Sequence, residues 1–263
     1  MNDTKIPPLH LEHNGSGIPV LLIHGFPFTS RMWRPQLSGL AASGHILAPD
    51  LPGFGRTPAA PPPHSVERLA AACLDAVTAL GIHEPVVLGG LSMGGYIALA
   101  AARHFPERLR GLMLLSTRAG ADSAEAKANR DKSIATAQAE GPAPAGEGMY
   151  PKLLAPENYA AQPETASELK AILQGATTEG VVMGLTAMRD RPDATDELPE
   201  INLPTLIIHG QQDQVIPFSE AEAMAAAIPH SQLHLLPQAG HVPNLEQPER
   251  FNQAVTEFLG RLS

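Results

Sequence analysis

The 263-residue sequence lacks several features that would assign it to a specialised class of protein. It contains one cysteine, Cys73, so no intramolecular disulfide can form and no oxidising compartment is implied. Cys73 lies in an apolar stretch, which indicates a buried helix residue. No apolar run approaches the ~20 residues that cross a membrane, and the first residues lack an apolar segment of signal-peptide length. We therefore expect a cytoplasmic protein with no membrane partner.

Basic residues are in the minority. The sequence has 18 Lys and Arg against 27 Asp and Glu, which gives a formal net charge of −9 at pH 7. This balance excludes the basic surface of a typical nucleic-acid-binding protein.

Cofactor and metal motifs are missing too: there is no complete G-x-G-x-x-G after a strand, no Walker loop and no CxxC, and His230 and His234 lack the glutamate of H-E-x-x-H. We expect no cofactor, no metal and no nucleic-acid partner, while the oligomeric state stays open.

Short apolar runs alternate with longer helical patterns along most of the chain. This alternation is typical of an α/β fold in which helices cover both faces of a mostly parallel sheet. The expected strands are 20–23, 46–48, 86–88, 111–115, 206–208 and 233–236. The expected helices between and after them are 65–80, 94–104, 219–227 and 248–262.

Strand patterns disappear between about Thr117 and Leu203, where helical patterns take over. Asp122 with Glu125 three residues later indicates a helix start, and Gly141 indicates its end. We therefore predict a core of residues 1–116 and 204–263 with a helical insertion at 117–203, whose further helices are 164–176 and 178–189. Most apolar residues of the insertion should pack on the core, and a minority could face a substrate pocket. The residues in question are Met149, Leu153, Leu154, Val181, Val182, Met183, Leu185 and Met188.

The most specific motif is Gly90-Leu-Ser-Met-Gly-Gly, which fits G-x-S-x-G between an expected strand and an expected helix. In such a nucleophile elbow, a sharp turn holds the serine in a strained conformation with its hydroxyl exposed. The helix N-terminus adds positive potential, and the N–H of Met93 can point at a developing oxyanion. We predict that Ser92 is a nucleophile; the alternative is a glycine-rich loop with a solvent-facing serine.

A serine hydroxyl is a weak nucleophile and needs a general base within hydrogen-bond reach. Of the 11 histidines, His241 is the best placed, because it follows strand 233–236 in a loop where the sites of open α/β sheets lie. Asp213 follows strand 206–208 and could fix the tautomer of the imidazole. The order Ser92, Asp213, His241 is also the one that accompanies such an elbow. Asp122 is the second choice for the acid, and Asp50 is expected to brace a loop.

A second oxyanion donor should come from the loop after strand 20–23, which reads His24-Gly-Phe-Pro. The N–H of Phe26 is the candidate donor, and Gly25 would let the chain turn tightly. We expect His24 to brace this loop rather than to act as a base. Trp33, the only tryptophan, is a candidate substrate-binding residue, although a core position is an equal alternative.

Together these motifs resemble the α/β-hydrolase fold superfamily, from about Pro19 to Leu262, with the insertion in the place of that family's cap. The motifs that carry the resemblance are His24-Gly-Phe-Pro, Asp50-Leu-Pro-Gly-Phe-Gly, Gly90-Leu-Ser-Met-Gly-Gly, His209-Gly-Gln-Gln-Asp and Gly240-His. The segment before Val20 is short, so the first strand of the family's sheet should be missing or very short.

Two further stretches resemble the bacterial 3-oxoadipate enol-lactonase and carboxylesterase branch. They are Thr117-Arg-Ala-Gly-Ala-Asp and Arg191-Pro-Asp-Ala-Thr-Asp-Glu-Leu-Pro. The resemblance implies a cofactor-free esterase or lactonase that acts on a small acyl substrate through an acyl-enzyme. Haloalkane dehalogenases and epoxide hydrolases are disfavoured, because they carry aspartate where this chain has Ser92. Alternatives are a perhydrolase or haloperoxidase-type activity on the same triad, or a ligand-binding receptor on a hydrolase scaffold.

Overall fold

A seven-stranded sheet forms the centre of the structure, a computed structural model that describes residues 5–262. The strand order is β1-β3-β2-β4-β5-β6-β7, and only β1 runs antiparallel to its neighbour. The strands are β1 Leu11–Asn14, β2 Pro19–Ile23, β3 His45–Pro49, β4 Val86–Leu91, β5 Leu109–Leu115, β6 Thr205–Gly210 and β7 Ser231–Leu236. The expected mostly parallel sheet is confirmed, and the very short first strand is β1.

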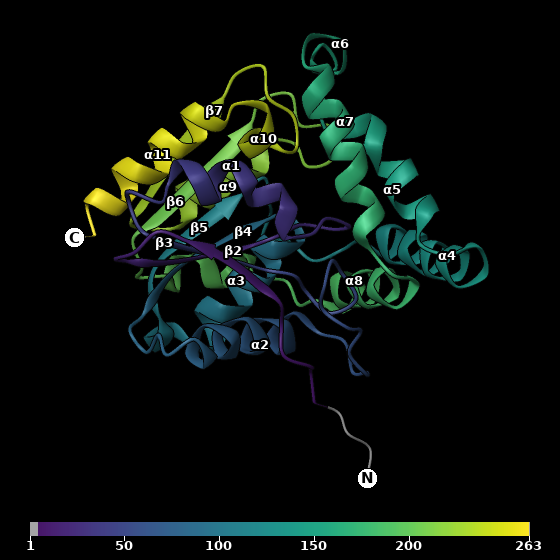
Figure 1. Cartoon of the computed structure of the whole chain (residues 1–263), viewed down its shortest axis with the longest axis horizontal. Coiled ribbons are helices and arrows are strands. Elements are labelled where there is room, and N and C mark those ends of the chain that lie inside the picture. The colour runs from purple at the N-terminus through teal and green to yellow at the C-terminus, as the bar shows by residue number, and fades with distance from the viewer. Residues whose placement is uncertain (1–4, 263) are drawn as a thin grey trace.

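Alternate residues of the central strands face opposite layers of the core. In β2, Leu21 and Ile23 belong to one buried cluster, whereas Val20 and Leu22 belong to the other. A strand that is covered on both faces needs apolar side chains at every position, which explains its continuous apolar run. Figure 1 shows helices on both sides of the sheet. One layer contains α1 Arg34–Gly39, α10 Pro243–Glu246 and α11 Pro248–Gly260, and the other contains α2 Val66–Ala79, α3 Met93–His104 and α9 Ser219–Ala227.

The helix boundaries follow local signals in the sequence. Ser65 caps α2 with a side chain that accepts a hydrogen bond from the N–H of Arg68. Cys73 is fully buried on the inner face of this helix, as expected. Pro248 stands at the first position of α11, where a missing N–H costs no hydrogen bond.

Between β5 and β6 the chain forms a group of helices at one end of the sheet (Figure 1). They are α4 Ala124–Glu140, α5 Ala143–Met149, α6 Asn158–Ala161, α7 Pro163–Ile172 and α8 Thr178–Asp190. The first of them begins one residue later than expected, because Ser123 rather than Asp122 caps the N–H of Ala126. Gly141 ends this helix with φ 89°, a conformation that glycine adopts readily. We call residues 117–203 the cap; its treatment as a separate insertion stays a prediction.

Main-chain hydrogen bonds connect the cap to the core at two places far apart in the sequence. Near α8, the N–H of Thr177 donates to the carbonyl of Gly53 at 2.8 Å, and the N–H of Gly55 donates to Gly175 at 2.7 Å. The N–H of His241 donates to the carbonyl of Leu153 at 2.8 Å. The cap is therefore tied both to the loop after β3 and to the loop after β7.

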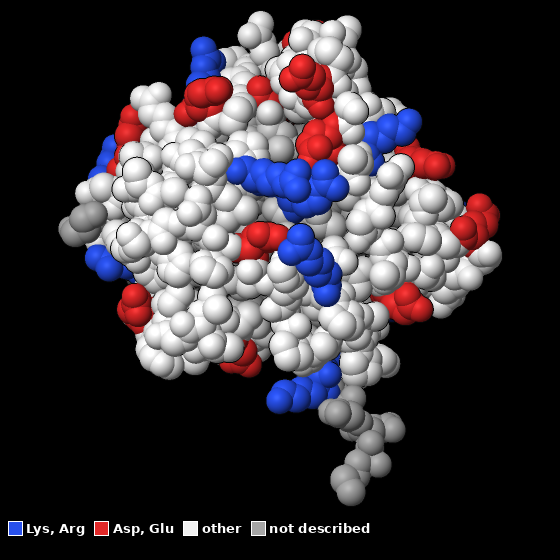
Figure 2. All heavy atoms as spheres, viewed as in Figure 1, with Lys and Arg blue, Asp and Glu red and all other residues white. Residues whose placement is uncertain are grey.

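Uncharged side chains cover most of the face shown in Figure 2, and several basic side chains lie next to acidic ones. Ion pairs of this kind include Arg31 with Glu168 at 2.9 Å and Arg56 with Glu12 at 3.1 Å. Among residues 5–262, no helix combines the length and the apolar character needed to cross a membrane.

Candidate active site

Ser92 lies in the sharp turn between β4 and α3. Its backbone has φ 54° and ψ −112°, a combination that L-residues rarely adopt and that costs roughly 1–3 kcal/mol. Hydrogen bonds hold the turn from both sides: the N–H of Ser92 donates to Leu115 at 2.9 Å, and its carbonyl accepts from the Thr117 hydroxyl at 2.8 Å. This strained turn is the geometry that the G-x-S-x-G motif predicts.

Glycine is required on both sides of this serine because the main chain comes very close to itself. A Cβ atom on Gly90 would collide with the backbone carbonyl of Gly94, where strand and helix nearly meet. A Cβ atom on Gly94 would collide with the carbonyl of Ile23 at the end of β2. The elbow is therefore packed directly against the loop that begins with His24.

Asp213 and His241 come together from the loops after β6 and β7. Oδ2 of Asp213 lies 2.8 Å from Nδ1 of His241, and both side chains are fully buried. The other carboxylate oxygen of Asp213 accepts hydrogen bonds from the N–H groups of Val215 at 2.8 Å and Ile216 at 3.0 Å. Since Asp213 accepts from Nδ1, the Nε2 atom of a neutral His241 carries a lone pair and can accept a proton.

A second histidine, His209 in β6, also reaches this carboxylate. Its Nε2 lies 3.1 Å from Oδ2 of Asp213 and 2.9 Å from the carbonyl oxygen of Ile216. Both neighbours are acceptors, so Nε2 of His209 must carry the hydrogen. Burial alone would raise the pKa of Asp213, but the charge of His241 and the hydrogen bonds from His209, His241 and Ile216 hold that pKa well below its ordinary value. The sequence analysis assigned no role to His209.

The structure leaves Ser92 and His241 without a hydrogen bond between them. Nε2 of His241 is buried and has no hydrogen-bond partner within residues 5–262. Ser92 is 6% exposed and lines a pocket, whereas His241, in the loop after β7, is fully buried. Catalytic hydrogen bonds in unliganded enzymes are often long or misaligned and tighten when substrate binds.

The backbone amides of Phe26 and Met93 are both available for a ligand. Neither N–H has a hydrogen-bond partner in the described part of the chain. The two side chains are neighbours, because a Cβ atom on Gly184 of the cap would lie 2.8 Å from the Phe26 ring and 3.3 Å from the Met93 sulfur. Two free N–H groups beside a serine are what an oxyanion hole requires.

His24 and Asp50 brace the loops around this position, as expected. Nε2 of His24 accepts from the N–H of Leu51 at 3.0 Å, and its Nδ1 donates to the carbonyl of Gly25 at 2.8 Å. Burial lowers the pKa of His24, which keeps the ring neutral and able to accept. The carboxylate of Asp50 accepts from the N–H groups of Ser30 at 2.8 Å and Arg56 at 3.0 Å.

Two other candidates from the sequence lie elsewhere. The carboxylate of Asp122 forms ion pairs with Arg118, Arg130 and Arg191, so it does not orient His241. Trp33 is fully buried, and its ring packs near that of Phe251 with 6.3 Å between centroids. The structure therefore places Trp33 in the core, where a large apolar ring removes the most surface from water, and not among the pocket-lining residues.

The pocket beside Ser92 lies between the elbow and the cap and has a volume of about 600 Å³. Such a volume suits a small molecule. Phe26 contributes to its floor, and Val215 and Ile216 come from the loop after β6. Three of the apolar cap residues considered above line the pocket: Met149, Leu185 and Met188. Leu153, Leu154, Val181 and Met183 are buried and do not line it.

Within residues 5–262, no group of three His, Cys, Asp or Glu side chains is arranged to hold a metal ion.

A mostly parallel sheet with a strained serine after its central strand, and with an aspartate and a histidine after two later strands, defines the class of α/β hydrolases. Residues 20–254 match the sequence model of the alpha/beta hydrolase family, and the chain belongs to this family. The resemblance seen in the motifs is thus confirmed.

Individual relatives are similar over nearly the whole chain. A thermophilic esterase from Thermogutta terrifontis, solved with malate bound, is 42% identical, with a TM-score of 0.94 over 97% of this chain and 93% of its own. The 2-hydroxymuconate semialdehyde hydrolase of Pseudomonas putida is 31% identical in an alignment 262 positions long, which covers 95% of this chain and 90% of that protein. The 3-oxoadipate enol-lactonase 2 of Acinetobacter baylyi is 27% identical over 232 residues, covering 88% and 85% of the two chains.

Proposed function

We propose that this hydrolase cleaves carboxylic esters or lactones through an acyl-enzyme on Ser92. The observation that carries the proposal is the strained backbone of Ser92 at the pocket, combined with the hydrogen bond of 2.8 Å between Asp213 and His241 at the same edge of the sheet. The similarity to an esterase and to an enol-lactonase supports the same reaction class.

In the proposed first half-reaction, Oγ of Ser92 attacks the ester carbonyl carbon while Nε2 of His241 accepts the hydroxyl proton. The N–H groups of Phe26 and Met93 donate to the oxyanion of the tetrahedral intermediate. Collapse of this intermediate breaks the bond to the alcohol oxygen, which takes the proton from His241. In a lactone the alcohol stays attached to the acyl group.

In the second half-reaction, His241 takes a proton from a water molecule, and the resulting hydroxide attacks the acyl-enzyme. A second tetrahedral intermediate collapses, Ser92 recovers its proton from His241, and the carboxylic acid leaves. Asp213 stays ionised throughout and stabilises the imidazolium. Its low pKa supports this role, because the carboxylate remains charged over the whole working range of pH.

The test is the hydrolysis of a p-nitrophenyl ester with a short acyl chain by wild type, by Ser92→Ala and by Ser38→Ala, a control on the exposed side of α1. Loss of the nucleophile should lower kcat by about 10⁶-fold, as triad knockouts do elsewhere. The control should keep wild-type turnover. A fluorophosphonate should add to the wild type, and mass analysis of peptides should place the adduct on Ser92. Retention of most activity in Ser92→Ala would refute the proposal.

Two further readouts separate the alternative functions. Peroxide-dependent bromination in acetate buffer that exceeds ester hydrolysis would favour a perhydrolase. A burst of p-nitrophenol followed by almost no turnover would favour a ligand-binding receptor.

A further inference from the structure

The pocket of Ser92 is positively charged although the chain as a whole carries a net charge of −9. The basic residues that line it are Arg118, Arg130 and Lys152, and the one acidic residue among its lining residues is Asp122. Three cations and one carboxylate leave an excess of positive charge next to the reacting serine. Asn129 and Ser133 of α4 add neutral polar groups to the same wall.

Asp122 cannot neutralise this wall, because three guanidinium groups share its single carboxylate. Oδ1 accepts from Nη2 of Arg118 and from Nη1 of Arg191, both at 2.8 Å, and Oδ2 accepts from Nε of Arg130. The Asp122 side chain itself is fully buried. Burial would raise its pKa, but the hydrogen bond and charge of Arg130 and the charge of Arg191 lower it, so Asp122 stays a carboxylate.

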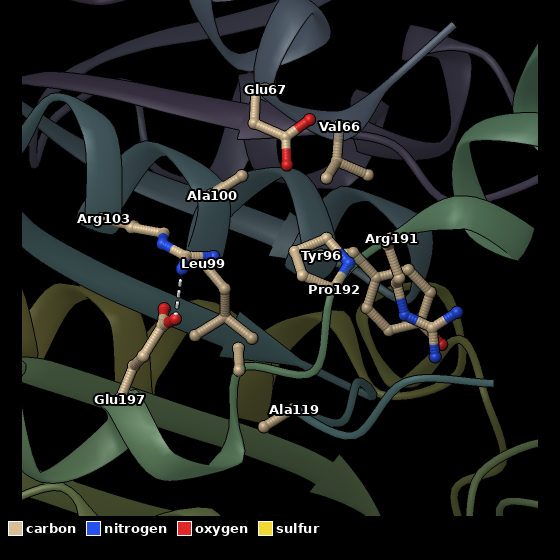
Figure 3. Close-up of a pocket in the computed structure, with 11 residues that line it drawn as sticks. Val66, Glu67, Tyr96, Leu99, Ala100, Arg103, Ala119, Arg191, Pro192 and Glu197 are labelled. Atoms are coloured by element: carbon tan, nitrogen blue, oxygen red, sulfur yellow. Dashed lines mark ion pairs between the residues drawn. The ribbon is translucent and has the colours of Figure 1, made fainter. Parts of the chain in front are cut away.

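Both terminal amino groups of Arg191 are used by the protein, and Nη1 pairs with Asp122. Its Nη1 also donates to the carbonyl of Met188 at 2.6 Å, and its Nη2 donates to Gly120 at 2.7 Å. The guanidinium carbon lies 4.0 Å from the centroid of the Tyr96 ring, and Figure 3 shows the two side chains against each other. This side chain is only 2% exposed, so Arg191 is a structural cation rather than a ligand.

Arg118 and Arg130 keep hydrogen-bond donors that Asp122 does not use. Arg130 engages Asp122 through Nε, which leaves its two terminal amino groups, and its side chain is 21% exposed. The side chain of Arg118 is 29% exposed and engages Asp122 through Nη2. Lys152, at the edge of the same pocket, forms no ion pair in this part of the chain. The partly exposed guanidinium groups of Arg118 and Arg130 and the ammonium group of Lys152 are therefore placed to meet an anionic group in the pocket.

We infer that the substrate carries a carboxylate at the end remote from its ester or lactone group, and that Arg130 and Arg118 bind this carboxylate with Lys152 at the rim. A planar guanidinium matches a carboxylate with two parallel hydrogen bonds. Met149, Leu185 and Met188 line the same pocket, and their apolar side chains suit a short methylene chain that joins the two ends of the substrate. This assignment rests on the proposed ester hydrolysis and adds the class of substrate: half-esters of dicarboxylic acids or carboxylated lactones.

The test compares pairs of substrates that differ only in this remote charge. Monoethyl glutarate, adipate and pimelate are each paired with the ethyl ester whose free carboxylate is replaced by a carboxamide. 4-Acetoxybutanoate, paired with 4-acetoxybutanamide, places the charge on the alcohol side of the ester instead. For at least one pair, wild type should show a kcat/KM for the acid about 10-fold or more above that for the amide, the range that charge-assisted hydrogen bonds give.

Variants of Arg130 and Lys152 test whether these side chains cause the preference for the acid over the amide. Arg130→Gln should lower the acid-to-amide ratio of kcat/KM towards one, mainly through KM, and Lys152→Met should lower it less because Lys152 is exposed. Arg34→Gln, an exposed arginine outside the pocket, is the matched control and should keep the wild-type ratio. Added NaCl should lower kcat/KM for the acids and leave the amides unchanged.

The outcomes separate this inference from the proposed function. Equal hydrolysis of acids and amides by wild type would overturn the inference and leave ester hydrolysis standing. A preference that survives both Arg130→Gln and Lys152→Met would also overturn the assigned site. If no ester is hydrolysed in a Ser92-dependent way, the proposed function fails. Should Arg130→Gln not fold, as thermal unfolding would show, Lys152→Met and the salt dependence decide.

Discussion

The carboxylate of Glu246 accepts a hydrogen bond of 2.7 Å from the N–H of Gly240, the residue immediately before His241. Its other oxygen accepts from the N–H of Ala155 at 2.8 Å and from the side chain of Asn158 at 2.7 Å. Glu246 is buried, and it therefore connects the loop of the proposed base to the cap through one side chain. We therefore expect the position of the His241 loop to depend on this connection.

Glu246→Gln should lower both stability and turnover. Glutamine offers one acceptor oxygen, so its amino group must face a backbone or side-chain N–H, and at least one buried donor loses its partner. Such a loss costs about 1–3 kcal/mol. We expect a lower melting temperature and a reduced kcat, because the loop that carries His241 is no longer fixed. Glu249→Gln, an exposed residue in the first turn of α11, is the control and should change neither quantity. Wild-type melting and kcat in Glu246→Gln would contradict the prediction.

Asp213→Asn should lower kcat by about 10⁴-fold with little change in fold. The amide can present its NH₂ to Nδ1 of His241, which favours the tautomer that cannot accept a proton from Ser92. Ester hydrolysis at neutral pH measures the effect, and circular dichroism checks the fold. Asp131→Asn, an exposed aspartate that pairs with Arg189, serves as the control. A loss smaller than tenfold would show that Asp213 does not set the tautomer.

Asp122→Asn should remove a contribution to stability that depends on pH. The folded-state pKa of Asp122 lies below its ordinary value, so ionised Asp122 stabilises the fold above pH ~3.9 and this stabilisation is lost as pH falls further. Urea unfolding of wild type and variant should therefore differ by about 1.5–3 kcal/mol at neutral pH. The difference should shrink in acid. A difference that is constant with pH would mean that the charge of Asp122 is unimportant.

Gly90→Ala should disrupt the elbow. Its Cβ would collide with the main chain of Gly94, and backbone atoms cannot move aside as a flexible side chain can. We expect a lower melting temperature together with loss of esterase activity. Gly260→Ala in α11 is the matched control, because nothing lies within 4 Å of a Cβ there. That change should leave stability the same or raise it by up to ~1 kcal/mol. Wild-type activity in Gly90→Ala would mean that the turn can relax without loss of function.

The sequence predicts the central strands and their flanking helices because burial on two faces leaves a plain apolar pattern. It predicts β1 poorly, since Leu11-Glu-His-Asn mixes apolar and polar residues at a half-exposed edge. Asp213 and His241 could be predicted from their places after two strands, and the structure brings them into contact.

Residues whose partners lie far along the chain could not be predicted. Asp122 matches a local capping pattern, but its side chain pairs with Arg191, 69 positions away. Glu246 is the last residue of the short helix α10, and its partners Ala155 and Asn158 lie about 90 positions earlier. His209 is part of a visible motif, yet only the fold shows that it shares the carboxylate of Asp213.

At two places the cap is attached to the core through main-chain atoms, at Gly53 with Thr177 and at Leu153 with His241. Such bonds are insensitive to which side chains the neighbouring helices carry. Evolution or design can therefore exchange Met149, Leu185 or Met188, and so alter which molecules enter, while the geometry around the nucleophile is preserved. We therefore expect the pocket lining to tolerate substitution more readily than these main-chain contacts do.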